Sequence, residues 1–208
     1  AKFVALNKNN LSFWLKRYEI NKVFRDGPVK IGRDREFTQC DADVVGIDGE
    51  LIEAELLSLF VSAFKKLNID VVIKYNSRKL MSGLILESGV DSELVPEITT
   101  IIDKKDKMNS EEINTFLAEF GLTENQIMLL NKYFDMDLNE LTKTFQNTEN
   151  EKIKQGLLEI NNLSTYLKGI DISDICEFSS SLARGQNYYT GNVFEVYEKN
   201  GKIKGSIG

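Results

Sequence analysis

Charged side chains with the chemistry of an anion site surround a turn near the start of the chain. Residues 25–43 read RDGPVKIGRDREFTQCDAD, which sets three arginines and a lysine around a glycine/proline turn. Guanidinium and ammonium groups bind phosphates, whereas amides and carboxylates bind polar, hydrogen-bonding ligands. The segment therefore predicts a polyphosphate site that adjoins Gln39, Asp41 and Asp43.

Two strands must position these groups. Apolar and polar residues alternate over residues 18–24 and again over residues 37–45, which predicts a strand on each side of the turn. Side chains of like parity share a strand face, so the amide and both carboxylates project together. Arg25 joins them if the strands pair in an even-sum register. This polar strand face (Arg25, Gln39, Asp41 and Asp43) suits the floor of a cleft for a charged ligand, and spacing alone leaves a solvated hairpin equally open.

A second segment with reactive residue types lies near the end of the chain. Residues 181–197 read SLARGQNYYTGNVFEVY, with Arg184 before a glycine and adjacent tyrosines at Tyr188 and Tyr189. An alternating apolar run follows them. The pattern predicts a loop that leads into a strand.

Together, these two segments resemble the catalytic core of histidyl-tRNA synthetases. YEINKVFRDGPVKIGRDREFTQCDADVVG is similar to motif 2 of the class II synthetases, and LARGQNYYTGNVFEVY is similar to the histidine-specific signature. We call residues 182–197 the signature segment. The resemblance covers essentially the whole chain. It implies an α+β fold with a class II synthetase-like antiparallel β-sheet and flanking helices, plus an all-α insertion domain.

The resemblance implies a role for each residue that matches an ATP-binding position. Arg25 would bind the α-phosphate of ATP, and Phe37 would stack on the adenine. Arg33 would lie near the γ-phosphate. Arg184 would face the α-phosphate from the side opposite Arg25, so these two arginines form the implied catalytic pair.

The resemblance also implies a histidine-binding set. Gln39 would bind the backbone of the amino-acid substrate, and Asp43 would accept the imidazole N–H. Tyr189 would hold the other ring nitrogen, and Arg184 and Tyr188 complete the set.

The implied reaction is attack of a histidine carboxylate on the α-phosphorus of ATP, followed by transfer of the histidyl group to tRNA(His). ATP is then a substrate, Mg²⁺ is bound largely through its phosphates, and no protein metal site is predicted. An α-carboxyl group is ionised at neutral pH and needs no general base, so a chain without histidine can perform this chemistry. The same lack of histidine argues against a Ser-His-Asp or Cys-His hydrolase.

Residues outside the two segments predict the remaining elements. Apolar residues at helical spacing predict a helix over residues 50–67, and residues 70–75 read as a short strand. Residues 77–165 are predicted to be almost entirely helical. Capping-box helix starts are expected at Ser110, Thr123 and Asp137, and helix stops at Gly89 and Gly121.

These patterns predict two structural units. A partial class II catalytic core spans residues 1–76 and 166–208, and the helical insertion spans residues 77–165. Motifs 1 and 3 and an anticodon-binding domain are not recognised, so we expect a fragment that is inactive or very weak alone. The full-length protein is expected to be a homodimer that contacts tRNA(His) through the insertion and the missing anticodon domain.

Three lysines of the insertion are candidates for contact with tRNA phosphates: Lys104, Lys105 and Lys107. A solvated charged turn is the favoured interpretation, because Asp103 and Asp106 cancel much of their charge.

One rival function is left open. A non-catalytic histidine-binding paralogue, such as the regulatory subunit of ATP phosphoribosyltransferase, shares this core. The long insertion and the presence of Arg25, Arg33 and Arg184 argue against it.

Composition sets the remaining limits. The formal net charge of −6 gives no global basic field, so nucleic-acid contacts must be local. No apolar run of membrane-spanning length occurs. Two cysteines, Cys40 and Cys176, are too few for a disulfide framework, which favours a reducing, cytoplasmic setting.

Overall fold

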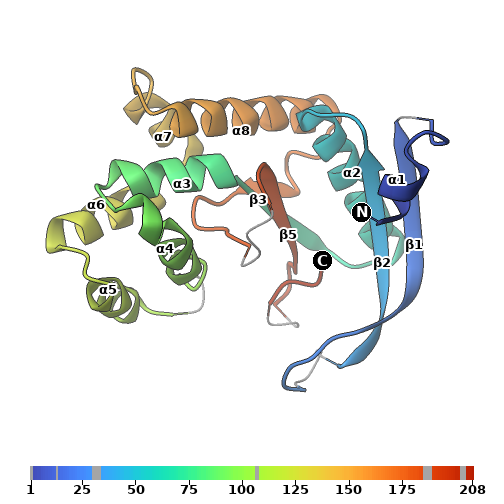
Figure 1. The fold of residues 1–208 in the computed structure, drawn as a ribbon, viewed down its shortest axis with the longest axis horizontal. Helices are drawn as coiled ribbons and strands as arrows, with labels where there is room; N and C mark the ends of the chain where they lie inside the picture. The colour runs from blue at the N-terminus through green and yellow to red at the C-terminus, as the bar shows by residue number, and fades with distance from the viewer. Residues whose placement is uncertain (1, 13, 30–33, 106–107, 185–188, 202–204) are drawn as a thin grey trace. The chain divides into compact units, whose positions relative to one another are not determined.

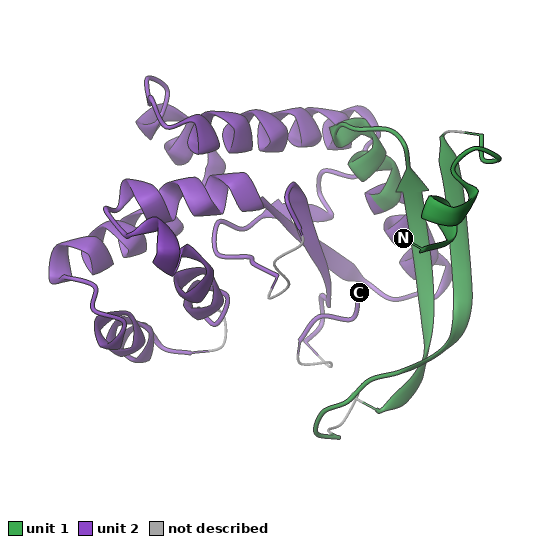
Figure 2. Cartoon of the chain, in the orientation of Figure 1, with its two compact units in different colours: residues 1–56 green, residues 57–208 purple. Residues whose placement is uncertain are grey.

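The computed structural model describes residues 2–12, 14–29, 34–105, 108–184, 189–201 and 205–208, and it divides the chain into two compact units, residues 1–56 and 57–208 (Figure 2). Unit 1 contains α1 (Lys2–Asn7), β1 (Leu15–Phe24), β2 (Glu36–Val45) and the start of α2 (Glu50–Lys66). Unit 2 contains the rest of α2 and the following elements: β3 (Val71–Ser77), α3 (Arg78–Glu87), a 3₁₀ turn (Ser92–Leu94), α4 (Val95–Ile102), α5 (Ser110–Glu119), α6 (Glu124–Phe134), α7 (Leu138–Thr144), α8 (Glu151–Gly169), β4 (Cys176–Phe178) and β5 (Asn192–Glu198) (Figure 1).

β1 and β2 form the antiparallel hairpin that the alternation predicts. Their register pairs Asn21 with Gln39 and Arg17 with Asp43, so the partner numbers have an even sum. The amide of Arg25 donates to the carbonyl of Arg35 over 2.9 Å and extends the ladder by one pair. Odd-numbered residues of both strands therefore share one face, which confirms the register on which the polar strand face depends.

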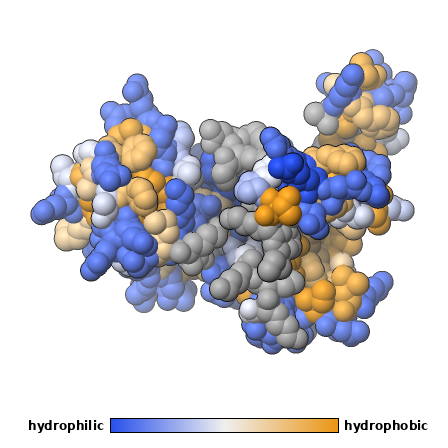
Figure 3. All heavy atoms as spheres, turned by 90° about the horizontal axis from the view of Figure 1, so that it is seen from below, coloured by the Kyte–Doolittle hydropathy of each residue, from blue (hydrophilic) through white to orange (hydrophobic). Residues whose placement is uncertain are grey.

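The opposite face of the hairpin carries exposed apolar side chains beside the ion pair of Lys22 with Glu36. Tyr18 is 79% exposed, Ile20 63% and Phe24 75%. Apolar areas reach the molecular surface at several places in the view of Figure 3. The two faces of the hairpin thus differ in chemistry, although the apolar one is not buried by the residues that the structure describes.

The sheet of unit 2 is mixed, with strand order β4-β3-β5. β5 pairs antiparallel to β3, whereas β4 pairs parallel to it through Ile73 and Cys176. The prediction of an antiparallel sheet is therefore wrong for this pair of strands. A parallel pair needs a long crossover, and the helices between β3 and β4 supply one.

Local signals placed the helices of unit 2 well. Capping boxes occur at Thr123 with Gln126 and at Asp137 with Glu140, as predicted. The third box uses Asn109 rather than Ser110, because it is the Asn109 side chain that accepts from the amide of Glu112. Two glycines follow helix ends with positive φ, Gly89 at 80° and Gly121 at 84°, a conformation that glycine adopts without strain.

α3 and α8 lie side by side and pack through glycine (Figure 1). A Cβ placed on Gly156 would lie 2.3 Å from the backbone nitrogen of Leu80, and one on Gly83 would lie 2.7 Å from the Ile153 side chain. Leu80 is fully buried at this crossing. The two helices thus approach until backbone meets backbone, which only residues without a side chain permit.

The strand and helix predictions outside the hairpin also hold. α2 and β3 match the expected helix and short strand closely, and the Phe60 ring of α2 packs edge-on against Phe194 of β5, with centroids 5.5 Å apart. Every described element over residues 78–169 is helical. These helices and the three-stranded sheet belong to one compact unit, so a separate insertion domain over residues 77–165 stays a prediction.

A membrane-crossing helix would need a long and predominantly apolar stretch. In the described residues no helix has both the length and the apolar character to cross a membrane.

Candidate functional site

In unit 1, the odd-numbered face of the hairpin holds a network of charged and amide groups. Arg17 contacts the carboxylate of Asp43 over 3.2 Å and that of Glu19 over 2.6 Å. The Gln39 side-chain amide donates to Asp41 over 2.7 Å. Asp43, the predicted imidazole acceptor, thus has Arg17 as a neighbour, which the sequence analysis did not consider. Arg17 is odd-numbered like Asp43, so this shared parity could have identified it.

The turn end of the same face pairs Arg25 and Phe37, two of the three residues predicted to bind ATP. The Arg25 guanidinium lies 4.3 Å from the centre of the Phe37 ring, and its Nε donates to the carbonyl of Asp34 over 3.0 Å. A cation over an aromatic face is electrostatically favourable, so Phe37 holds Arg25 near the hairpin surface. Arg33 lies outside the described residues.

In unit 2, Arg184 is part of a hydrogen-bonded chain on the signature segment. Its Nη1 contacts Oε1 of Glu195 over 2.6 Å, and Oε2 of Glu195 accepts from the Tyr197 hydroxyl over 2.5 Å. Tyr189 also contributes a side-chain hydrogen bond to Arg184. Glu195 was not predicted, although an acidic residue inside an alternating apolar strand is a recognisable signal. Tyr188 lies outside the described residues.

The environment of Arg184 favours its charged form. Partial burial acts to lower the pKa of the guanidinium, but the hydrogen bond and negative charge of Glu195, with a contribution from Tyr189, raise the pKa above its ordinary value. Its side chain is 35% exposed, whereas that of Glu195 is 16% exposed. Arg184 is therefore a permanent cation that still reaches solvent.

The predicted site residues thus fall into two groups, each placed within one unit. Unit 1 brings together Arg25, Phe37, Gln39 and Asp43 on one hairpin face. Unit 2 brings Arg184 and Tyr189 together. The convergence of both groups on one cleft stays a prediction.

The lysines of the insertion have protein partners. Lys105 contacts Asp135 over 2.5 Å, and Lys104 lies 5.6 Å from the centre of the Phe116 ring. Lys107 lies outside the described residues. These contacts agree with the interpretation as a charged turn, because the two lysines already interact with groups of the chain itself.

The cysteines and acidic residues show no arrangement for metal or thiol chemistry in the described parts of the chain. No group of three or more potential metal ligands gathers there. Cys40 is exposed, whereas burial raises the pKa of the Cys176 thiol to about 11, which suppresses its thiolate at neutral pH.

Sequence comparison identifies the family of this chain. The model of the histidyl-tRNA synthetase family matches residues 2–204. The histidine–tRNA ligase 1 of Bacillus anthracis is 37% identical over 209 residues, with 100% of this chain and 49% of the relative covered. The ligase of Bacteroides fragilis is 35% identical over 209 residues, with 94% and 44% covered. The chain belongs to the histidyl-tRNA synthetase family, and it spans about half the length of the curated relatives it matches.

Solved structures share the fold. Histidyl-tRNA synthetase from Nostoc sp. PCC 7120 superimposes with a TM-score of 0.89 and 27% identity, over 99% of this chain and 49% of that one. A protein of Bacillus halodurans C described as an ATP phosphoribosyltransferase regulatory subunit/histidyl-tRNA synthetase gives a TM-score of 0.78 at 18% identity, over 96% of this chain and 52% of that one. At this lower identity the likeness concerns the fold alone.

Proposed function

We propose that the protein to which this chain belongs activates histidine with ATP and transfers it to tRNA(His). The observation that carries the proposal is the family match over residues 2–204, in a chain that retains both Arg25 and Arg184. The curated relatives that match along the whole chain are named histidine–tRNA ligases. Because the chain spans half of their length, the activity is proposed for the full-length protein.

In the first step a carboxylate oxygen of histidine attacks the α-phosphorus of ATP. A new P–O bond forms, the bond between the α-phosphorus and the bridging oxygen breaks, and pyrophosphate leaves with that electron pair. Two anions must approach one another, so cations beside the phosphorus lower the barrier by stabilising charge on its oxygens. Arg25 and Arg184 would supply these cations.

In the second step the terminal ribose hydroxyl of the tRNA attacks the carbonyl carbon of histidyl-adenylate. The new ester forms as AMP leaves, and the hydroxyl proton is released. This step would use the same two arginines to hold the phosphate of the leaving group.

The ion pair between Arg184 and Glu195 has a consequence for the first step. In this structure the guanidinium of Arg184 donates to Glu195 through Nη1. An arginine carries five N–H donors, so Arg184 could keep this contact and present its other donors to the α-phosphate. Glu195 would then orient the guanidinium.

Recognition of histidine would depend on Asp43 and Tyr189. The Asp43 carboxylate would accept one imidazole N–H, and the Tyr189 hydroxyl would bond the other ring nitrogen. The Asp43 carboxylate, which contacts Arg17 in this structure, would then also contact the substrate.

The other components follow from the same proposal. The Mg²⁺ ion would be held largely through ATP phosphates, which requires few protein ligands. The ion would supply further positive charge at the phosphates. The full-length protein would be a cytoplasmic homodimer, with residues 77–165 as an insertion domain that approaches the tRNA acceptor arm.

An alternative is a non-catalytic histidine-binding paralogue. Its support is limited to likeness of fold, at 18% identity for the Bacillus halodurans C protein and 16% for an ATP phosphoribosyl transferase (HisG:HisZ) complex from Thermotoga maritima. Histidine binding without nucleotide chemistry would identify this case.

Histidine-dependent exchange of pyrophosphate into ATP tests the proposal. A full-length ligase that contains this chain should catalyse exchange, and Arg184→Ala should slow it by about 10² to 10³, as expected for loss of one preorganised charge-stabilising group. Exchange at the unchanged rate in the variant would remove Arg184 from the mechanism. Histidine binding with no exchange by the unaltered protein would overturn the proposed activity itself.

A further inference from the structure

The backbone before and after the tyrosines of the signature segment is held by side chains from other elements. Asn76, at the end of β3, donates from Nδ2 to the carbonyl of Ser180 over 2.8 Å and to that of Leu182 over 3.0 Å. The Ser180 hydroxyl donates to the carbonyl of Phe134, the last residue of α6, over 2.7 Å. Asn76 is fully buried, so these bonds are shielded from water.

Arg78, the first residue of α3, binds both ends of the stretch between Arg184 and Gly191. Its Nη1 donates to the carbonyl of Arg184 over 3.0 Å, and its backbone amide donates to the carbonyl of Gly191 over 3.1 Å. One residue thus binds the chain at Arg184 and again at Gly191, just before β5 begins. The side-chain contact joins residues that lie 106 positions apart along the chain.

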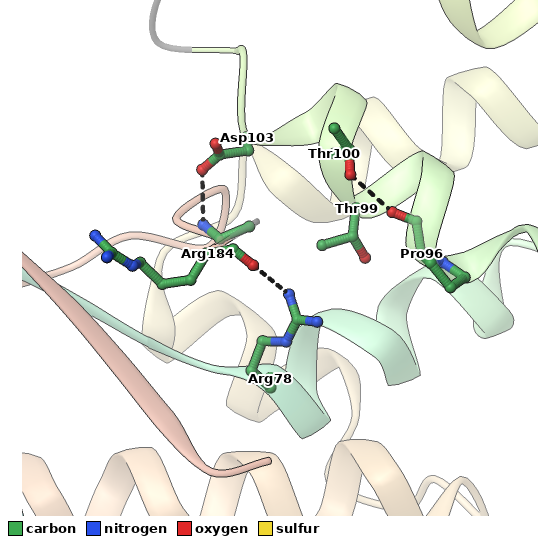
Figure 4. A pocket seen from close by; sticks show the side chains of 7 residues that line it. Arg78, Pro96, Thr99, Thr100, Asp103 and Arg184 are labelled. Atoms are coloured by element: carbon green, nitrogen blue, oxygen red, sulfur yellow. Dashed lines mark hydrogen bonds between the residues drawn. The ribbon is translucent and has the colours of Figure 1, made fainter. Parts of the chain in front are cut away.

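Asp103 holds the same place from the opposite side. Its Oδ1 accepts from the amide of Ala183 over 3.3 Å, immediately before Arg184. Arg78 and Asp103 both line a small pocket between α4 and the signature segment (Figure 4). In that view the guanidinium of Arg184 points away from α4. The pocket contacts therefore constrain the backbone of Arg184 and leave its charged group available.

We propose that Arg78 and Asp103 are positioning residues for Arg184, which fix the peptide backbone at residues 183–184 and thereby aim its guanidinium. The inference rests on the proposed role of Arg184 in adenylate formation. It assigns to the helices that follow β3 a part in the chemical step, because α3 carries Arg78 and Asp103 directly follows α4.

The physical reason is the reach of an arginine side chain. Its guanidinium is separated from the backbone by a flexible stem, so a small shift of the peptide plane moves the charged group by a comparable or larger distance. A misplacement of about 1 Å can cost a factor of about 10² in rate. Two hydrogen bonds flank the peptide group that joins Ala183 to Arg184, one at the amide of Ala183 and one at the carbonyl of Arg184, and they resist such a shift.

The test is a double-mutant cycle in a full-length ligase that contains this chain, measured by histidine-dependent pyrophosphate exchange. Arg78→Ala should lower kcat by about 10- to 100-fold with smaller changes in KM, because the lost alignment is needed mainly in the transition state. In the Arg184→Ala background, Arg78→Ala should change the rate by less than about threefold, since a residue that acts through Arg184 has nothing left to position.

Matched variants separate positioning from folding. Arg78→Lys should recover part of the rate, because a lysine can donate to the Arg184 carbonyl. Thr100→Ala is the control from the same pocket, since its hydroxyl donates within α4 to Pro96 and not to the signature segment, and it should exchange at the unaltered rate.

A second measurement needs no catalysis. Asp103→Ala should increase hydrogen exchange at the Ala183 amide in this chain, while amides of the α3 and α8 core keep their protection. Unchanged Ala183 exchange, or equal losses of rate from Arg78→Ala in both backgrounds, would overturn the inference. If Arg184→Ala itself leaves pyrophosphate exchange unaltered, the proposed function of Arg184 fails instead, and the two failures are thus distinguishable.

Discussion

The glycine crossing of α3 and α8 makes a strong prediction about stability. In Gly156→Ala, the new methyl carbon would lie 2.3 Å from the nitrogen of Leu80 and 2.6 Å from its Cα and Cβ. Carbon atoms in favourable contact are about 3.5–4.0 Å apart, so the helices must separate by about 1 Å or more at this point. Because backbone atoms form the contact, no side chain can rotate away to relieve it.

The magnitude follows from two opposing effects. Overpacking of a core costs about 1–3 kcal/mol, and a backbone contact belongs at the upper end. Alanine is a better helix former than glycine by about 1 kcal/mol. The variant should therefore lose about 2 kcal/mol of unfolding free energy, which corresponds to a fall in Tm of about 4–8 °C for a chain of this size.

Gly169 provides the matched control. It is the last residue of the same helix, and a Cβ there meets no atom within 4 Å. Gly169→Ala should thus leave Tm unchanged or raise it slightly, because only the propensity gain remains. Gly83→Ala should fall between the two, since its Cβ would lie 2.7 Å from the Ile153 side chain and 2.9 Å from the Ile153 backbone nitrogen, which is less close than the 2.3 Å contact at Gly156.

Thermal and urea unfolding followed by circular dichroism would measure these differences. A Gly156→Ala chain as stable as the unaltered one, or less destabilised than Gly83→Ala, would contradict the close approach of the two helices.

Two further predictions concern the hairpin and the sheet of unit 2. Asp43→Ala in the full-length protein that contains this chain should weaken histidine binding and leave ATP binding intact, as measured by calorimetry. The control is Glu36→Ala, which lies on the opposite face in an ion pair with Lys22 and should affect neither ligand. An equal loss of both ligands in Asp43→Ala would refute its assignment to histidine, since an exposed pair such as Arg17 with Asp43 contributes only about 0–1 kcal/mol to folding. Burial raises the pKa of the Cys176 thiol from its ordinary value of 9.0 to about 11, so the folded state holds the thiol proton more tightly than the unfolded state. The free energy of unfolding should therefore fall as pH rises from about 9 to 11. Cys176→Ala should flatten that part of the Tm–pH curve, and a curve of unchanged slope would exclude the buried thiol as its cause.

Local patterns in the sequence were sufficient for much of the structure. Period-two alternation is a property of neighbouring residues, so it predicted both hairpin strands and the shared parity of Gln39, Asp41 and Asp43. Capping boxes span only four residues, and those at Thr123 and Asp137 occur where expected. The box at Asn109 was misplaced by one residue, because Ser110 is also a good capping residue and only the hydrogen bond distinguishes them.

The resemblance of two segments went further than periodicity. It identified the family that residues 2–204 match, and it named Arg25 and Arg184 as a pair although many residues separate them. It did not identify Glu195 or Arg78 as neighbours of Arg184, because those two contacts depend on how the chain folds.

The sequence by itself thus determined the hairpin strands, β3 and β5, several helix ends and the chemical types available at the proposed site, since these depend on residues a few positions apart. Only the tertiary structure decided that β4 lies parallel to β3, that Gly156 meets Leu80, and that Arg78 and Asp103 hold the backbone beside Arg184. Each of these contacts joins segments far apart in the chain. They form only when packing of the whole unit supplies the free energy that brings such segments together, so no short stretch of sequence can encode them alone.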